Sequence, residues 1–278
     1  MDMRYKKPGL IFIACIACVC FVAPLSASEY YQRFSSLSKE DKVMWSNTAG
    51  VALISVWGLA TWDYGSRNPH MEDDGWFRQN DKNGGMDKLG HLYTNYALAH
   101  GLSYLYQSWG YKTQRAALLG SLSSFGLMGF MEFGDAFGGY GFSREDFIMN
   151  ALGAITGYVF YTRPELARRI DIRVEYIPSG QRDIFTDYEH MKFTLALKLD
   201  GIRSVRNKYL KYLDIQLGYY TRHYSPEPES NSERNLYLAI GINLSHVFNR
   251  LAQPKTARLF NYYQVPYTYI ERSENLND

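Results

Sequence analysis

The chain has 278 residues, and its 30 Lys and Arg against 28 Asp and Glu leave a formal net charge of only +2. This near-balance excludes a polybasic nucleic-acid-binding protein, and an apolar content of 46% excludes a disordered chain. The mean hydropathy of −0.32 is too low for a chain made mostly of membrane helices.

Residues 1–28 have the pattern of an export signal. A positive segment (4–7) precedes an uncharged apolar run (10–22), and small residues at 26–28 offer a cleavage point. We therefore predict an exported protein, located in the periplasm or at the outer membrane, whose mature chain begins near Glu29. A retained signal that anchors the chain in the inner membrane is the alternative.

All three cysteines, Cys15, Cys18 and Cys20, lie within this apolar run. A mature chain without them has no disulfide, no thiolate metal site and no cysteine nucleophile. Lipid attachment at Cys18 is a further alternative, although Cys15 stands where a lipoprotein signal usually has Leu.

Four apolar stretches of helical length follow, and Gly or Pro ends several of them. The segment between the first two, 63–85, is polar and rich in Gly, so we expect a loop there. Gly153 and Gly157 have the small-xxx-small spacing that lets two helices approach closely. The predicted helices are 43–62, 87–107, 113–133 and 145–161.

Beyond residue 165 apolar and polar residues alternate with a period of two, which is typical of strands with one apolar face. The sequence predicts an α+β fold, with a bundle of about four helices in a domain over 29–164. An antiparallel β-meander of four to five strands follows in a domain over 165–278. The expected strands are 170–176, 191–199, 213–219 and 236–244, with a weak edge strand over 262–269.

The sequence leaves three arrangements open for the apolar face of this sheet. We expect it to pack on the helices and to leave the charged face in water. Contact with lipid is the alternative, since alternating strands suit an outer-membrane barrel, but four or five strands are too few to close one alone. A mixed arrangement, in which the helices plug or complete a partial barrel, is the third.

Three of the predicted helices carry a polar pair three or four residues apart, so each pair shares one helix face. Antiparallel packing of these helices brings the pairs to the same end of the bundle. The pairs are Asp87 with His91, Glu132 with Asp135, and Asp146 with Asn150, and Lys88 stands beside the first.

These polar residues have a catalytic and a structural interpretation. In the first, His91 is a general base or metal ligand oriented by Asp87, and Lys88 stabilises developing negative charge. Glu132 and Asp146 then supply acid–base chemistry or bind a divalent cation. The candidate ligands His91, Glu132, Asp135 and Asp146 favour zinc, manganese or magnesium. In the second, the residues are helix caps, as Ser143 before Asp146 indicates, or a buried network that fixes helix register.

A second group of polar and aromatic side chains lies in the predicted loop before the second helix. His70 with Glu72 or Asp74 could bind a metal, or the loop could cover the site as a lid. A solvated loop anchored by Trp76 and Phe77 is the structural alternative.

The order of these motifs resembles that of a known family. The stretches Gly-Gly-Met-Asp-Lys-Leu-Gly-His (84–91), Glu-x-x-Asp (132–135) and Gly-Phe-Ser-x-x-Asp-x-x-x-Asn-x-x-Gly (141–153) resemble the YfiM-like family of predicted periplasmic lipoproteins. The resemblance covers about residues 60–160, and 218–222 and 241–245 also look similar. More distantly, the pattern is similar to VanZ-like membrane proteins. The family resemblance implies an envelope location but no reaction.

The sequence thus predicts an exported, membrane-associated envelope protein that binds an envelope lipid, a glycan or a membrane protein, and no nucleic acid. An enzyme that modifies such a lipid or glycan with the His/Asp/Glu cluster, with or without a metal, is the alternative. An integral membrane protein with three or four short spans is a third interpretation. The pattern names no cofactor, substrate or oligomeric state.

Overall fold

The computed structural model of the chain describes residues 27–277 except 181–182 and 225–226. The three cysteines, the lipidation alternative and nearly all of the predicted signal lie outside the described residues. The chain has two compact units, residues 1–45 and 46–278. In the first, helix α2 (Ala27–Ser36) precedes the start of helix α3 (Lys39–Thr61), where the Ser38 hydroxyl accepts a hydrogen bond from the Asp41 amide at 3.0 Å.

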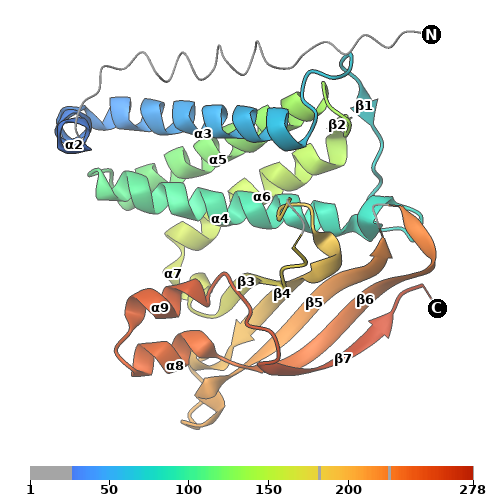
Figure 1. Ribbon diagram of the computed structural model, residues 1–278. Coiled ribbons are helices and arrows are strands. Elements are labelled where there is room, and N and C mark those ends of the chain that lie inside the picture. The colour runs from blue at the N-terminus through green and yellow to red at the C-terminus, as the bar shows by residue number, and fades with distance from the viewer. Residues whose placement is uncertain (1–26, 181–182, 225–226, 278) are drawn as a thin grey trace. The chain divides into compact units, whose positions relative to one another are not determined.

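The second unit confirms the predicted α+β fold, with helices followed by an antiparallel sheet (Figure 1). After the rest of α3 it contains α4 (Met86–Ser108), α5 (Thr113–Asp135) and α6 (Arg144–Thr162), which pack on one another. A Cβ atom at Gly153 would lie 2.4 Å from the Leu92 carbonyl oxygen of α4. The predicted close approach of two helices at this glycine is therefore confirmed.

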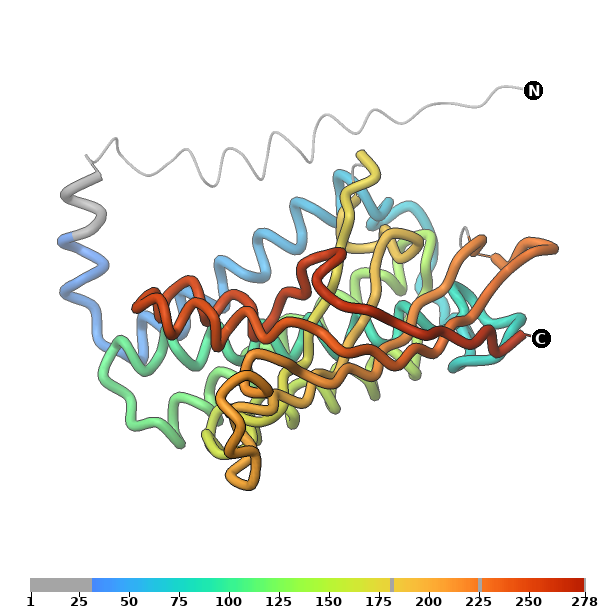
Figure 2. Tube along the Cα trace, turned by 90° about the horizontal axis from the view of Figure 1, so that it is seen from below, coloured from blue at the N-terminus to red at the C-terminus, as the bar shows by residue number. Residues whose placement is uncertain are grey.

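The predicted loop over 63–85 contains two short elements. Strand β1 (Met71–Glu72) pairs in parallel with β2 (Phe142–Ser143), and a 3-10 segment, η1 (Lys82–Gly85), leads into α4. The loop also contacts the hairpin formed by β5 (Leu213–Tyr224) and β6 (Pro228–Ile242), where Tyr219 donates a hydrogen bond to the Gly84 carbonyl. Figure 2 shows this hairpin alongside the loop.

The five-stranded sheet has the order β3-β4-β5-β6-β7, and all neighbours are antiparallel, as the sequence predicts. The last strand, however, begins seven residues later than the predicted edge strand over 262–269. Tyr263 forms only an isolated parallel bridge with Val174, and Pro266 has no N–H with which to extend a ladder. The remaining strands are β3 (Ile170–Tyr176), β4 (Met191–Lys198) and β7 (Tyr269–Asn275).

Several short helices were not predicted. Helix α7 (Pro164–Ala167) leads into the sheet, and α8 (Leu244–Arg250) and α9 (Pro254–Leu259) follow β6. The predicted strand over 236–244 stops at Ile242 because the Asn243 side chain accepts a hydrogen bond from the His246 amide and so caps α8. Single 3-10 turns occupy Tyr188–His190, Leu199–Gly201 and Leu210–Tyr212.

The expectation that the charged face of the sheet lies in water is wrong. Arg173 is 2% exposed and donates hydrogen bonds of 2.8 Å to both Asp171 and Asp214. Lys198 pairs with Asp171 at 2.6 Å. Alternation distinguishes the two faces of a strand but does not say which face is buried, and these charges pair with one another across strands. Glycine on the same face leaves room for one of them, since a Cβ at Gly241 would lie 2.6 Å from Asp214 Oδ1.

The apolar face of the sheet packs on a helix at one end only. Phe193 and Met191 form a core cluster with Met86 of α4, together with Val174 and Tyr219. Further along the same face, Leu238 is 63% and Ile240 is 61% exposed. The predicted packing of this face on the helices therefore holds for one end of it.

Two of the described helices, α3 and α5, are long and apolar enough to cross a membrane. Within the apolar 18-residue stretch of each helix, 6% of the α3 residues and 44% of the α5 residues are buried. Length and composition alone satisfy this test, so membrane crossing stays a prediction, as does the division into domains at residue 164.

Candidate functional site

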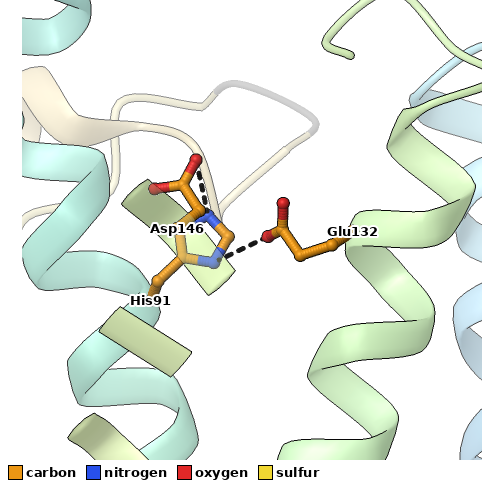
Figure 3. A group of neighbouring side chains, drawn as sticks. All are labelled: His91, Glu132 and Asp146. Carbon is orange, nitrogen blue, oxygen red and sulfur yellow. Dashed lines mark ion pairs between the residues drawn. The ribbon is translucent and has the colours of Figure 1, made fainter. Parts of the chain in front are cut away.

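Three helices bring His91, Glu132 and Asp146 together. His91 lies in the second turn of α4, Glu132 near the end of α5 and Asp146 in the first turn of α6. The His91 Nδ1 atom is 3.2 Å from Glu132 Oε1, and its Nε2 atom is 3.8 Å from Asp146 Oδ2 (Figure 3). The imidazole thus lies between two carboxylates from two other helices.

Asn150 and Ser143 support this arrangement from α6 and its N-cap. The Asn150 Oδ1 atom lies 3.4 Å from His91 Nδ1, while its amide group donates to Glu132 Oε1, also at 3.4 Å. The Ser143 hydroxyl accepts a hydrogen bond from the Asp146 amide at 3.2 Å, so the predicted cap is confirmed. Asp146 therefore starts its helix and contributes a carboxylate to the cluster.

A fully buried lysine adjoins the cluster. The Lys88 Nζ atom is 2.8 Å from Asp87 Oδ2, 3.0 Å from Asp146 Oδ1 and 3.8 Å from Asp74 Oδ2. Its side chain is 0% exposed. Lys82 forms a further ion pair of 3.2 Å with Asp74. The lysine ammonium is thus the cation that compensates these three aspartates.

The remaining residues of the predicted set lie close by. Asp135 lies one turn beyond Glu132 on α5 and lines the same cavity. Asp74 comes from the loop that the sequence proposed as a metal site or lid. The loop histidine, His70, has its Nδ1 atom 3.3 Å from the Asn68 carbonyl oxygen. Neither His70 nor Glu72 belongs to a metal-ligand group among the described residues.

Burial separates the pKa values of the carboxyl groups. It raises the pKa of Glu132 to about 9, with the charges of Asp146 and Asp135 adding to the effect. Burial also raises the pKa of Asp135 to about 7. It raises the pKa of Asp87 to about 7 as well, although the positive charge of Lys88 acts in the opposite direction. For Asp146, burial is outweighed by His91 and Lys88, which together lower the pKa. A proton donor and an ionised acceptor therefore flank the His91 ring.

A cavity of about 900 Å³ adjoins the cluster. Its polar end is formed by His91, Glu132 and Asp146, together with the aspartates and lysines around them. The rest of its wall is mainly apolar and comes from α3, α4, α5 and the segment before β4. The apolar lining includes Ile54, Trp57, Leu98, Leu127, Met131 and Phe185.

Two sets of side chains have ligand atoms close enough for a metal ion. One is His91, Glu132 and Asp146, and the other is Asp74, Asp87 and Asp146, each with atoms within 4.8 Å of one another. Lys88 already supplies the positive charge of the second set. The first set, with one imidazole and two carboxylates, has the ligand chemistry of a Zn²⁺ or Mn²⁺ site.

Sequence reasoning missed several residues of the site. Trp57, Tyr140 and Tyr188 line the cavity, and Lys82 pairs with Asp74. Tyr188 lies 97 positions after His91 in the chain, so helix periodicity gives no signal for it. The sequence predicts Asp74 only as a candidate metal ligand with His70, and its position 3.8 Å from Lys88 has no signal in the sequence.

Residues 73–162 match the model of a family described as "Predicted periplasmic lipoprotein (DUF2279)". This range contains His91, Glu132, Asp146 and the three other acidic residues of the site. No curated protein and no solved structure is significantly similar to the chain. The specific YfiM-like and VanZ-like resemblances stay predictions. The family description supports the predicted exported location, in the periplasm or at the cell envelope.

Proposed function

We propose that this exported chain binds an envelope lipid. The acyl part of the lipid occupies the cavity lined by α3, α4 and α5, and its polar head lies at the His91–Glu132–Asp146 cluster. The observation that carries this proposal is the cavity itself, which has apolar walls along most of its length and charged groups at one end. Ligand cavities in proteins are typically about 300–1,000 Å³ and mostly apolar, with a few polar groups that fix orientation.

The charges at the polar end favour a particular head group. Five carboxyl groups, those of Asp74, Asp87, Glu132, Asp135 and Asp146, meet two lysines, Lys82 and Lys88. Both lysines are paired with these aspartates, so neither is free to bind a bare phosphate. A divalent cation held by His91, Glu132 and Asp146 would supply positive charge and give a lipid phosphate a ligand position. We therefore expect a phospholipid head group whose phosphate contacts the bound cation.

Lipid binding is tested by measuring the lipid that remains with the purified chain. Organic extraction and mass spectrometry of the wild type should recover lipid in a fixed ratio to protein. Met131→Trp, which fills the cavity, should reduce that ratio severalfold. Leu122→Trp is the matched control, because Leu122 lies on the same helix, is 57% exposed and does not line the cavity. Equal lipid in both variants, or none in the wild type, would contradict the proposal.

The cation is tested separately. Calorimetric titration with Mn²⁺ or Zn²⁺ should give one site in the wild type, and His91→Ala should weaken it by tenfold or more. His70→Ala is the control, since His70 is outside both ligand groups. If both variants lose cation binding, or neither does, the cation site at His91 is wrong. Lipid binding in the cavity is tested independently by the extraction experiment.

A lipid-modifying enzyme is the second candidate, and the position of His91 favours it. The ring contacts a carboxylate on each side and lies at the polar end of the cavity, where a lipid ester would be placed. His91 would then accept a proton from an attacking water, and Glu132 would donate one to the leaving oxygen. Release of fatty acid or head group from added phospholipid, lost in His91→Ala and kept in His70→Ala, is the expected result. Bound lipid that is recovered intact after long incubation would contradict this candidate alone.

A further inference from the structure

The outer face of the sheet carries an aliphatic surface that continues across four strands. Two cross-strand rows make it up, and the strand registers place their members directly opposite one another. One row aligns Leu195, Leu217 and Leu238, and the other aligns Leu197, Ile215, Ile240 and Ile270. Six of these seven side chains are between 43% and 85% exposed, and Leu197 is 36% exposed. We call these two rows the aliphatic surface.

Helix α4 covers the neighbouring part of the same face but not these rows. The next row, Val174, Phe193 and Tyr219, packs with Met86 and Leu89 in the core cluster. The opposite face of the sheet holds the paired charges of Arg173, Asp171 and Asp214. The sheet is therefore polar inside and apolar outside, the reverse of a sheet that covers a core. An apolar face of this size on a folded chain is characteristic of an interaction surface.

The end of the sheet next to the aliphatic surface is strongly basic. The segment 199–212 joins β4 to β5, and α8 and α9 follow β6 at the same end (Figure 1). The Asn243 amide hydrogen-bonds the Tyr212 carbonyl and so ties the two segments together. Residues 199–212 and 244–259 contain seven Lys or Arg and one acidic residue, Asp200. Exposed members include Arg203, Arg206, Lys208, Arg250 and Arg258.

An exposed tyrosine lies within this basic end. Tyr209 is 70% exposed, and Lys208 Nζ lies 5.0 Å from the centre of its ring. Tyrosine is enriched at the boundary between lipid head groups and acyl chains, where its ring is apolar and its hydroxyl is hydrated. Aliphatic side chains, an interfacial tyrosine and lysines or arginines thus follow one another along the same end of the sheet.

We propose that the aliphatic surface and the basic end dock on an anionic lipid bilayer. The aliphatic side chains enter the outer acyl region, and the lysines and arginines contact anionic head groups. The seven Lys and Arg beside the aliphatic surface match a bilayer, in which anionic head groups lie beside acyl chains, and a second copy of the chain is one outcome of the test below. The sheet lies on the bilayer and does not span it, since β7 is an edge strand and would expose backbone groups to hydrocarbon. This inference is independent of the lipid cavity and needs no ligand in it.

The test introduces a fluorescent reporter into the aliphatic surface of the full chain. Leu238→Trp is added to vesicles of phosphatidylcholine and phosphatidylglycerol, with acyl chains that are either brominated or not. Bromine quenches a tryptophan only in direct contact, so the emission added by this residue should be lost in brominated vesicles. Ser230→Trp is the matched control. It is exposed on the same strand, eight residues away or roughly 26 Å along it, and its emission should persist.

The charge requirement is tested in the same assay. Arg206→Glu with Lys208→Glu should restore the emission of Leu238→Trp, as should vesicles of phosphatidylcholine alone. Lys112→Glu with Arg115→Glu makes the same charge change at the start of α5 and should leave the quenching intact. Because the reporter senses its own surroundings, attachment of the chain by another segment cannot produce the expected signal.

Three results would overturn the inference. Unquenched emission from Leu238→Trp in brominated anionic vesicles would show that this surface does not meet lipid. Equal quenching at positions 238 and 230 would show that contact with lipid is not specific to the aliphatic surface. A doubled mass in vesicle-free buffer, with emission of Leu238→Trp already shifted to shorter wavelength, would assign the surface to a second copy of the chain.

Discussion

Lys88 and Asp146 form a buried ion pair of 3.0 Å between α4 and α6, and the same aspartate faces His91 with its other oxygen at 3.8 Å. One carboxylate thus connects the lysine-centred group of aspartates with the imidazole. The Asp146 charge interacts with both Lys88 and His91, so removing it affects both residues.

Asp146→Asn should lower the free energy of unfolding by about 3 kcal/mol, because a buried cation loses one of its compensating charges. Urea denaturation followed by circular dichroism measures the change. Glu165→Gln is the control, since its ion pair with Arg163 spans 4.0 Å and both side chains are more than half exposed; its effect should stay within about 0.5 kcal/mol. If the variant is as stable as the wild type, repulsion among the crowded carboxylates cancels the stabilisation from the ion pair. The crowding would then be retained for function.

The stability of the chain should fall as pH rises from 7 to 9, and Glu132 should cause it. The folded-state pKa of Glu132 is raised to about 9 from an ordinary value of 4.5. Between these values the folded chain holds a proton that the unfolded chain has released, so the free energy of unfolding falls by about 1.4 kcal/mol per pH unit. Asp87 and Asp135 act in the same direction only up to about pH 7.

Glu132→Gln removes this proton and should flatten the profile between pH 7 and 9. Denaturation midpoints at pH 7, 8 and 9, measured with chelator present, report the difference between wild type and variant. A bound divalent cation would keep Glu132 ionised, so cation added to the wild type should flatten its profile as well. A wild-type profile that is already flat in chelator would contradict the raised pKa.

The elements of the fold follow from local sequence patterns, and the orientation of the sheet does not. Helical length, a period of two and Gly or Pro breaks locate α3 to α6, β3 and β4 within a few residues. Strand β5 ends five residues later, and β6 begins eight residues earlier, than the sequence predicts. Which face of β3 is buried depends on pairing with residues far away in the chain, such as Arg173 with Asp214. Charged residues at alternate positions ordinarily indicate a solvated face, and here their mutual neutralisation reverses that rule.

The residues of the candidate site could be predicted from the sequence to a similar extent. Helix spacing and antiparallel packing place His91, Glu132 and Asp146 together, and the structure brings them into contact. The contribution of Asp74 to this site could not be derived, because it depends on how the loop over 63–85 folds back against α4 and the β5–β6 hairpin. The cavity could not be derived either, since Phe185 and Tyr188 reach it from a segment between two strands.

The close contact of α4 and α6 should depend on the absence of a side chain at Gly153. Alanine there would place its Cβ 2.4 Å from the Leu92 carbonyl oxygen, and backbone atoms cannot move aside without separating the helices. We expect Gly153→Ala to destabilise the chain by more than 2 kcal/mol, as overpacking does. Gly101→Ala on α4 is the control, because nothing lies within 4 Å of its added Cβ; it should be neutral or stabilising through helix propensity. Equal melting temperatures for the two variants would contradict the close packing.

The charges on the inner face of the sheet should behave as one buried network. Arg173 is 2% exposed and donates to Asp171 and Asp214 at 2.8 Å each. Arg173→Met therefore leaves the buried Asp214 without its cation, and Asp171 with Lys198 alone. Breaking such a pair costs about 3–5 kcal/mol. Arg272→Met is the control on β7, since Arg272 is exposed and lies opposite Leu238 on the outer face. Adding Asp214→Asn to Arg173→Met should restore part of the lost stability, because one unpaired charge is removed. If Arg173→Met costs no more than Arg272→Met in urea denaturation, the inner face is hydrated and the orientation of the sheet described above is wrong.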